Sequence, residues 1–137
     1  MSQPAEKSRH DRTVAQVARQ RFPYPNPRHP GWKTYLNQPE HTKGVDAQPD
    51  TVYPDIVVMD ERNAVMQLGE IETETTMNEA ETEQWKKYYS LCPSFYLYVP
   101  ANLGEEAVQL IASQKVQLDG LRLYSYDAQG NPMITNV

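Results

Sequence analysis

The chain has 137 residues, 39% of them hydrophobic and 23% charged, and this length and balance predict a single folded domain over residues 1–137. No apolar run approaches the roughly 20 residues of a spanning helix, and the polar start lacks the apolar segment of a secretory signal, so we expect a cytoplasmic protein with no membrane partner. The single cysteine, Cys92, excludes a disulfide framework and a cysteine metal site, and we interpret it as a buried apolar residue.

The net charge of −5 is distributed unevenly along the chain. Residues 1–44 contain eight Lys and Arg against three Asp and Glu, whereas residues 45–137 contain five against fifteen. The basic part is either a solvated arm or a surface for nucleic-acid phosphates, and both interpretations stay open. The acidic part repels nucleic acid unless divalent cations neutralise some of its carboxylates.

The first 50 residues are predicted to form a helix and then a proline-rich arm. Apolar residues recur at helical spacing from residue 5 onward and Pro23 ends the pattern, so the N-terminal segment 1–22 is expected to hold one amphipathic helix. Residues 23–50 contain six prolines and no hydrophobic period. This composition predicts a long arm with one short strand near residues 32–36.

Residues 51–127 alternate strand and helix patterns and form the predicted catalytic core. The expected elements are strands at 51–60 and 64–74 joined by a turn at 60–63, a helix at 79–91, a strand at 94–100, a helix from Asn102 to about Gln114, and a strand at 120–127. Asn78 and Asn102 each precede a glutamate by three residues, which predicts two helix N-caps. The tail, 128–137, carries no strong signal. The fold class is therefore α/β, with a mixed central β-sheet flanked by helices.

Three glutamates lie at alternate positions of the segment GEIETE, residues 69–74. Alternate residues of a strand share one face, so Glu70, Glu72 and Glu74 are expected on one side, where their charges repel, with Glu74 at the exposed end of the strand. The hairpin pairing is expected to bring Asp55 near Glu70. A group of hard oxygen ligands of this kind is how proteins hold Mg²⁺, which would explain the repeated charge.

The order of these motifs resembles the PD-(D/E)XK (restriction endonuclease-like) nuclease superfamily. Pro54-Asp55 is followed after fifteen residues by Glu70-Ile71-Glu72, similar to the family pattern of Pro-Asp on one strand and an acid, any residue and lysine on the next. Gln84 and Tyr88, four apart on the following helix, are similar to the QxxxY motif of RecB-type members. The order of elements also fits, so the resemblance implies a restriction endonuclease-like core.

The resemblance implies a nuclease that depends on Mg²⁺ or Mn²⁺ and hydrolyses DNA phosphodiester bonds. Asp55 and Glu70 would bind the metal, and the carbonyl of Ile71 would complete the ligand set. Glu72 stands where the family usually has its catalytic lysine. We therefore consider Glu72 itself and Lys87, three residues after Gln84, as catalytic candidates.

The partners follow from the same resemblance. Gln84 and Tyr88 would contact the nucleic-acid backbone, and a homodimer is expected by analogy with small nucleases that cut two strands. The alternative is a catalytically inactive relative that keeps the fold as a nucleic-acid- or protein-binding module, with Glu72 recording the lost lysine.

Other candidate residues have simpler interpretations. Glu6 and His10 on the first helix could add metal ligands, but we interpret them as part of a solvated helix face. The histidines of the arm lack metal-ligand spacing and are interpreted as surface residues. Aromatic residues that could stack on bases are interpreted as packing residues. These aromatic residues are Trp32, Tyr35 and Trp85.

Overall fold

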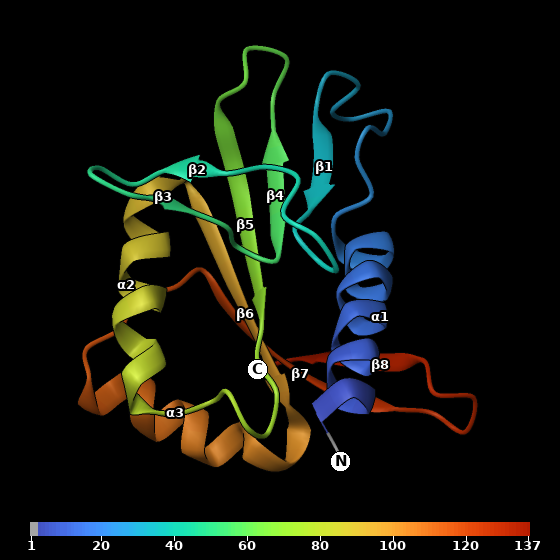
Figure 1. Ribbon diagram of the computed structural model, residues 1–137, viewed down its shortest axis with the longest axis vertical. Coiled ribbons are helices and arrows are strands. Elements are labelled where there is room, and N and C mark those ends of the chain that lie inside the picture. Colours follow the sequence, from blue (N-terminus) through green and yellow to red (C-terminus); the bar gives the residue numbers. More distant parts are fainter. Residues whose placement is uncertain (1–2) are drawn as a thin grey trace.

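A six-stranded mixed sheet forms the centre of the protein, with α1 on one face and α2 and α3 on the other (Figure 1). The computed structural model describes the chain from residue 3 and its side chains from residue 6. The α-helices are α1 (Gln3–Arg21), α2 (Thr82–Leu91) and α3 (Gly104–Ser113). The strands are β1 (Lys33–Leu36), β2 (Val45–Asp46), β3 (Thr51–Val52), β4 (Ile56–Met59), β5 (Val65–Ile71), β6 (Ser94–Pro100), β7 (Gly120–Tyr126) and β8 (Pro132–Asn136).

The strands of the central sheet run in the order β1-β4-β5-β6-β7-β8. The pairs β1·β4, β4·β5 and β7·β8 are antiparallel, and β5·β6 and β6·β7 are parallel. Each parallel connection passes through a helix on the same face, α2 after β5 and α3 after β6. The predicted α/β class, the mixed sheet and the β4·β5 hairpin are thus confirmed.

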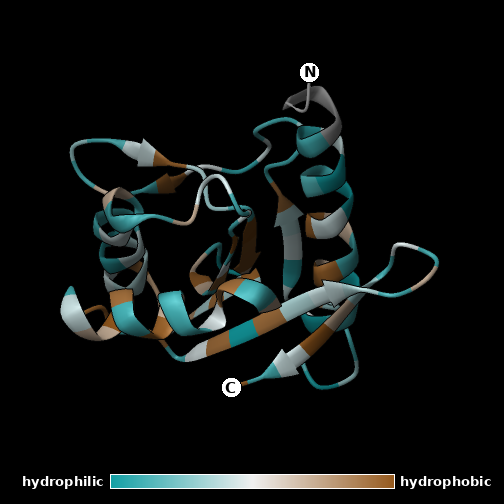
Figure 2. Cartoon of the chain, turned by 90° about the horizontal axis from the view of Figure 1, so that it is seen from below, coloured by the Kyte–Doolittle hydropathy of each residue, from teal (hydrophilic) through white to brown (hydrophobic). Residues whose placement is uncertain are grey.

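Two apolar cores lie on the two faces of the sheet. On the α1 side, Val14 and Val17 pack against Ile56 and Val58, and on the other side Trp85 and Tyr88 pack against the opposite faces of the same strands. All four residues of β4 are buried, as expected of a strand that is covered on both faces. In Figure 2, hydrophilic residues dominate the turns of α1 near its N-terminus, and apolar residues appear in the turns further along the helix.

The predicted strands at 51–60 and 64–74 are both shorter than expected. Pro54 and Asp55 separate β3 from β4, because proline has no N–H for the ladder, and β3 pairs with β2 in a small separate sheet. Strand β5 ends at Ile71. The segment that follows turns at Thr73–Thr76, where side-chain hydroxyls bond to one another and to the backbone.

The helix caps and the tail also differ in part from the predictions. The Asn78 side chain accepts a hydrogen bond from the backbone of Glu81, so this cap is confirmed, although it begins a 3-10 helix, η1 (Glu79–Glu81), directly before α2. Asn102 is not a cap, because it lies inside a second 3-10 helix, η2 (Ala101–Leu103). The tail forms β8, which the ladder with β7 stabilises rather than any strong strand propensity of its own.

Candidate functional site

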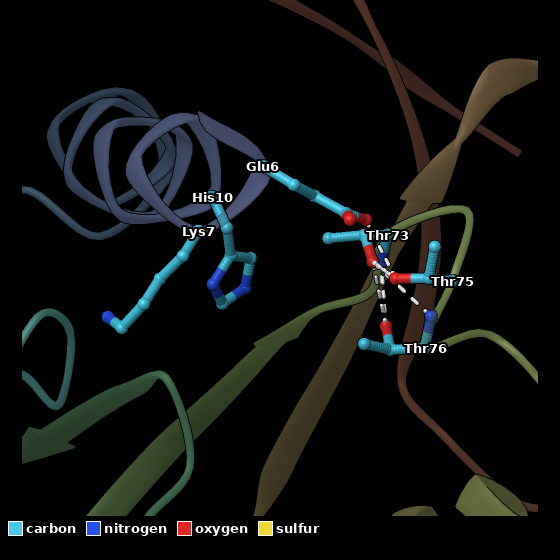
Figure 3. Close-up of a pocket in the computed structure, with 6 residues that line it drawn as sticks. All are labelled: Glu6, Lys7, His10, Thr73, Thr75 and Thr76. Carbon is cyan, nitrogen blue, oxygen red and sulfur yellow. Dashed lines mark hydrogen bonds between the residues drawn. The ribbon is translucent and has the colours of Figure 1, made fainter. Parts of the chain in front are cut away.

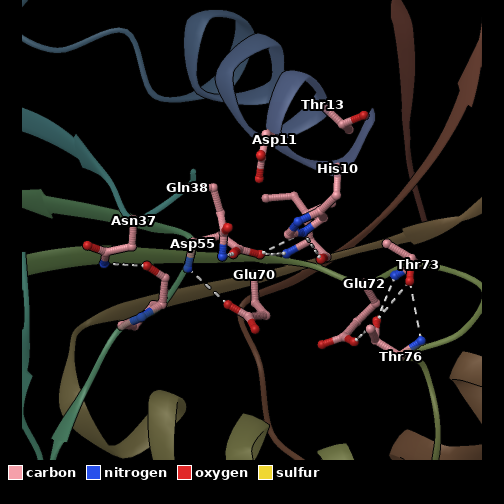
Figure 4. A network of polar contacts seen from close by, with 12 residues as sticks. His10, Asp11, Thr13, Asn37, Gln38, Asp55, Glu70, Glu72, Thr73 and Thr76 are labelled. Carbon is pink, nitrogen blue, oxygen red and sulfur yellow. Dashed lines mark hydrogen bonds and ion pairs between the residues drawn. The ribbon is translucent and has the colours of Figure 1, made fainter. Parts of the chain in front are cut away.

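The β4·β5 hairpin brings Asp55 and Glu70 together at the carboxyl end of β5. Ile56 pairs with Gly69, so the residues just outside this pair face each other across the hairpin. The Asp55 N–H donates to Glu70 Oε1 at 3.0 Å, and the Ile71 N–H donates to Asp55 Oδ2 at 2.9 Å (Figure 4). The expected proximity of these two carboxylates is confirmed.

Helix α1 adds His10 to this pair. Its Nε2 atom lies 2.9 Å from the Ile71 carbonyl oxygen and 3.4 Å from Asp55 Oδ2 (Figure 4). Burial lowers the pKa of His10, but its hydrogen bond and charge interaction with Asp55 and its contact with Ile71 outweigh burial and raise the pKa overall. The interpretation of His10 as a solvated residue is therefore wrong.

Glu72 is buried just beyond the end of β5, with only 1% of its surface exposed. Its Oε2 accepts from Trp85 Nε1 at 3.0 Å and its Oε1 accepts from the Thr76 hydroxyl at 2.7 Å. Burial raises the pKa of Glu72 to about 7, against the opposing effect of these two hydrogen bonds. Both carboxylate oxygens are thus engaged, and the Glu72 backbone is fixed by the Tyr98 carbonyl through its N–H.

Glu70, Glu72 and Glu81 form a second acidic group, in which one oxygen from each lies within 4.8 Å of the others. Burial, followed by the charges of Asp55 and Glu72, raises the pKa of Glu70 well above its usual range. Burial and the charge of Asp55 also raise the pKa of Glu81. Glu74 does not join this group, because it lies in the exposed turn after the strand. The expected exposure of Glu74 at the end of the segment is therefore confirmed, although β5 ends earlier, at Ile71.

The candidates on α2 are separated by the two sides of the helix. Tyr88 is buried against the sheet, and burial followed by the charges of Glu70 and Asp55 raises the pKa of its hydroxyl. Gln84 is half-buried. Lys87 is exposed, and no ion pair found among the described residues joins it to the carboxylates. The structure thus brings Tyr88 to the site but not Lys87.

Asp55 is held from its other side by residues of the proline-rich arm that directly follow β1. Gln38 Nε2 donates to Asp55 Oδ1 at 3.1 Å. Asn37 is fully buried, and its side chain donates to the carbonyls of Pro54 and Lys43 while accepting from the N–H groups of Thr42 and Lys43. The arm is therefore part of the structure that positions the site.

A pocket of about 220 Å³ opens beside His10, between the N-terminal turns of α1 and the Thr73–Thr76 turn. Lys7 and His10 line it from the helix, and three threonine hydroxyls line it from the turn (Figure 3). Glu6 accepts a hydrogen bond from Thr75 at 2.7 Å and so connects the two walls. The pocket gives the site an open side toward solvent.

The donor atoms at this site fit a hard divalent cation. Asp55 and Glu70 supply carboxylate oxygens, the neighbouring Ile71 supplies a carbonyl oxygen, and oxygen ligands of this kind suit Mg²⁺ and Mn²⁺. Among the described residues, His10 is the only basic side chain in an ion pair with these carboxylates, since the ion pairs of lysine involve carboxylates elsewhere. Burial is the main cause of the raised pKa of Glu70 and the charges of Asp55 and Glu72 add to it, and a bound cation would oppose the effect of these charges.

Sequence reasoning missed two residues of the site, although each had a signal. His10 precedes Val14 and Val17 by four and seven residues, so it extends the buried stripe of α1. Glu81 precedes Trp85 and Tyr88 by the same intervals and lies on the buried face of its helix. In both cases, an ionisable residue in line with buried apolar residues of a helix indicates a side chain that faces the interior.

Comparison of the chain with known protein families, curated proteins and solved structures finds no match. The function is therefore argued from the site. Among the described residues, no helix has both the length and the apolar character needed to cross a membrane.

Proposed function

We propose that this protein is a nuclease that hydrolyses DNA phosphodiester bonds and depends on Mg²⁺ or Mn²⁺. The observation that carries the proposal is the junction of Asp55, Glu70 and Ile71 at the end of the hairpin, where the Asp55 N–H donates to Glu70 Oε1 at 3.0 Å and the Ile71 N–H donates to Asp55 Oδ2 at 2.9 Å. A divalent cation bound there supplies a more acidic water and stabilises negative charge on a phosphate.

The residues of the site have distinct roles in this proposal. Asp55, Glu70 and the Ile71 carbonyl hold the cation, and His10 is placed to join them from α1. Gln38 orients Asp55 through its hydrogen bond to Oδ1. These contacts fix the carboxylates before substrate arrives, which reduces the cost of assembling the charged site.

The order of the elements supports the resemblance to PD-(D/E)XK nucleases. The Pro-Asp dipeptide lies directly before β4 of the hairpin, the Glu70 motif ends β5, and the Gln84 and Tyr88 positions follow on α2. The helix α1 precedes the hairpin, and β6 pairs with β5 in parallel after α2. This is the arrangement of helix, hairpin, helix and strand that the resemblance requires.

Cleavage assays with site variants test the proposal. We expect the wild type to cut DNA with Mg²⁺ or Mn²⁺ and to be inactive with EDTA. Asp55→Asn and Glu70→Gln, which keep side-chain shape, should each reduce the rate at least about 100-fold, since even outer-shell partners of a metal typically cost 10- to 100-fold. Glu83→Gln removes one exposed carboxylate from α2 and is the matched control. Undiminished cleavage by the double variant Asp55→Asn/Glu70→Gln would refute the site.

The burial of Glu72 favours one alternative, a catalytically inactive protein that binds nucleic acid or another protein. A carboxylate with both oxygens occupied by Trp85 and Thr76 replaces the usual lysine, and no other lysine takes its place in the described contacts. This alternative predicts no cleavage of any DNA or RNA with any divalent metal. Glu72→Lys cannot decide the matter, because it would place a charge in the Trp85 contact, so the wild-type assay over a panel of substrates is the test.

A further inference from the structure

A second polar pocket, of about 140 Å³, lies on the α1 side of the sheet. It is lined by Arg21, Phe22, Gln67, Tyr96, Tyr98 and Arg122. Glu70 and Gln67 are three residues apart on β5, so their side chains lie on opposite faces of the sheet, and the pocket is on the face opposite the Glu70 carboxylate. The pocket contains two arginines and no carboxylate.

Three adjacent strands and one helix end build this pocket. Gln67 comes from β5, and Tyr98 of β6 is the direct ladder partner of Arg122 on β7. Tyr96 lies two residues before Tyr98 and therefore shares its face. Arg21 is the last residue of α1. The polar groups thus converge from rigid elements rather than from loops.

The Arg122 guanidinium is held in place by its neighbours. It lies over the Tyr96 ring in a cation-π contact, with its central carbon 5.2 Å from the ring centroid. Gly120 provides the space beneath it, because a Cβ at that position would overlap the guanidinium nitrogens. Arg122 is therefore pre-organised over a flat surface with limited freedom.

Two buried polar atoms in the pocket have no partner. Arg122 Nε and Gln67 Oε1 are inaccessible to solvent and make no hydrogen bond within the structure. A buried polar group without a partner destabilises the folded protein, and the effect is larger when the group is charged. Rotation of the Gln67 amide by half a turn would present its NH₂ group at the same place. Both side chains can then donate to one ligand in the pocket.

The arginines also lack acidic partners. Within the described part of the chain, no carboxylate lies within ion-pair distance of Arg21 or Arg122, although the protein carries a net charge of −5. Arg21 donates to Asn136 Oδ1 at 2.9 Å, a neutral acceptor. Burial raises the pKa of Tyr98 to about 12, so its hydroxyl remains a neutral donor beside the two positive charges.

We propose that this pocket binds an oxyanion of the phosphate class through Arg21, Arg122 and the Tyr98 hydroxyl. Guanidinium groups match the geometry of phosphate oxygens and give short, charge-assisted hydrogen bonds. The ligand is either a free phosphate or the terminal phosphate of a nucleic acid, which present the same chemistry. The proposal does not depend on the nuclease activity, because the pocket shares no residue with the carboxylate site.

A titration followed by NMR tests the pocket in the whole protein. With inorganic phosphate added at constant ionic strength, the Arg122 Nε–H signal should shift and saturate with a Kd below about 10 mM, an affinity of roughly 3 kcal/mol. Arg21→Gln and Arg122→Gln should weaken binding at least about tenfold. Arg19→Gln removes an exposed arginine of α1 and should bind as the wild type does. A shift that does not saturate, or equal binding by all variants, overturns the proposal.

Two oligonucleotides of one sequence, with and without a 5′-phosphate, distinguish the sources. A larger shift of the Arg122 Nε–H signal with the phosphorylated strand than with the unphosphorylated strand identifies a nucleic-acid terminus as the ligand. If inorganic phosphate shifts the Arg122 Nε–H signal and neither strand shifts it further, the ligand is a free oxyanion. Failure of both phosphate and phosphorylated strand to move the Arg122 signal rejects the site, whatever the cleavage assay gives.

Discussion

The burial of Glu72 makes a quantitative prediction about stability and pH. The folded protein raises the pKa of this carboxyl from about 4.5 to about 7, mainly because burial disfavours the charge. A group with a raised folded pKa stabilises the fold fully below its unfolded pKa, and this contribution is lost as pH rises through the folded pKa. At about 1.4 kcal/mol per pKa unit, ionisation of Glu72 should therefore lower the free energy of unfolding of the metal-free protein by about 3 kcal/mol between pH 4.5 and pH 8.

Glu72→Gln isolates this contribution. The glutamine oxygen can accept from Trp85 Nε1 while its NH₂ donates to the Thr76 hydroxyl, so both hydrogen bonds are kept without the charge. Urea unfolding in EDTA at pH 5 and pH 8 gives the free energy of unfolding of each protein. The decrease in the free energy of unfolding over this range should be about 2.5 kcal/mol smaller in the variant than in the wild type. Glu74→Gln, in the exposed turn, is the control, and equal decreases in Glu72→Gln and wild type would refute the reasoning.

Two further substitutions test the contacts around the site. Trp85→Phe keeps a ring but removes the donor to Glu72, so at pH 8 it should lower the free energy of unfolding by about 2 kcal/mol, and an unchanged urea midpoint would contradict the role of this bond. Asn37→Ala leaves buried backbone groups unpaired, including the Pro54 carbonyl, so it should cost about 3 kcal/mol in the same assay and also weaken Mn²⁺ binding at Asp55 in a calorimetric titration. Unaltered stability of this variant would show that the arm does not support the site.

The fold was largely predictable because its hydrophobic patterns are strong. The apolar stripe of α1 indicates a helix, and the apolar run of β4 indicates a buried strand. The turn between β4 and β5 then predicts the hairpin. Strand β8 was not predictable in the same way, because its residues are ordered by pairing with β7 rather than by their own propensity. The end of β5 was missed because hydroxyl contacts within the Thr73–Thr76 turn outweigh the alternating pattern.

The candidate site was only partly predictable for a related reason. The proximity of Asp55 and Glu70 depends only on the pairing register of the short-range β4·β5 hairpin, which the sequence indicates. The contact of His10 with Ile71 spans 61 residues, and it depends on how α1 packs across the sheet. Glu81 could be read from sequence as a capping residue, and only the packing of α2 shows that its carboxyl also faces the site.

A crystal soaked in Mn²⁺ tests the central claim most directly. Anomalous scattering locates the ion without any assumption about substrate or activity. We predict one peak in contact with the carboxylates of Asp55 and Glu70 and with the Ile71 carbonyl, and no peak at this place in an Asp55→Asn crystal. A wild-type crystal without a peak there, or a peak that remains when Asp55 is replaced, would contradict the proposed metal site.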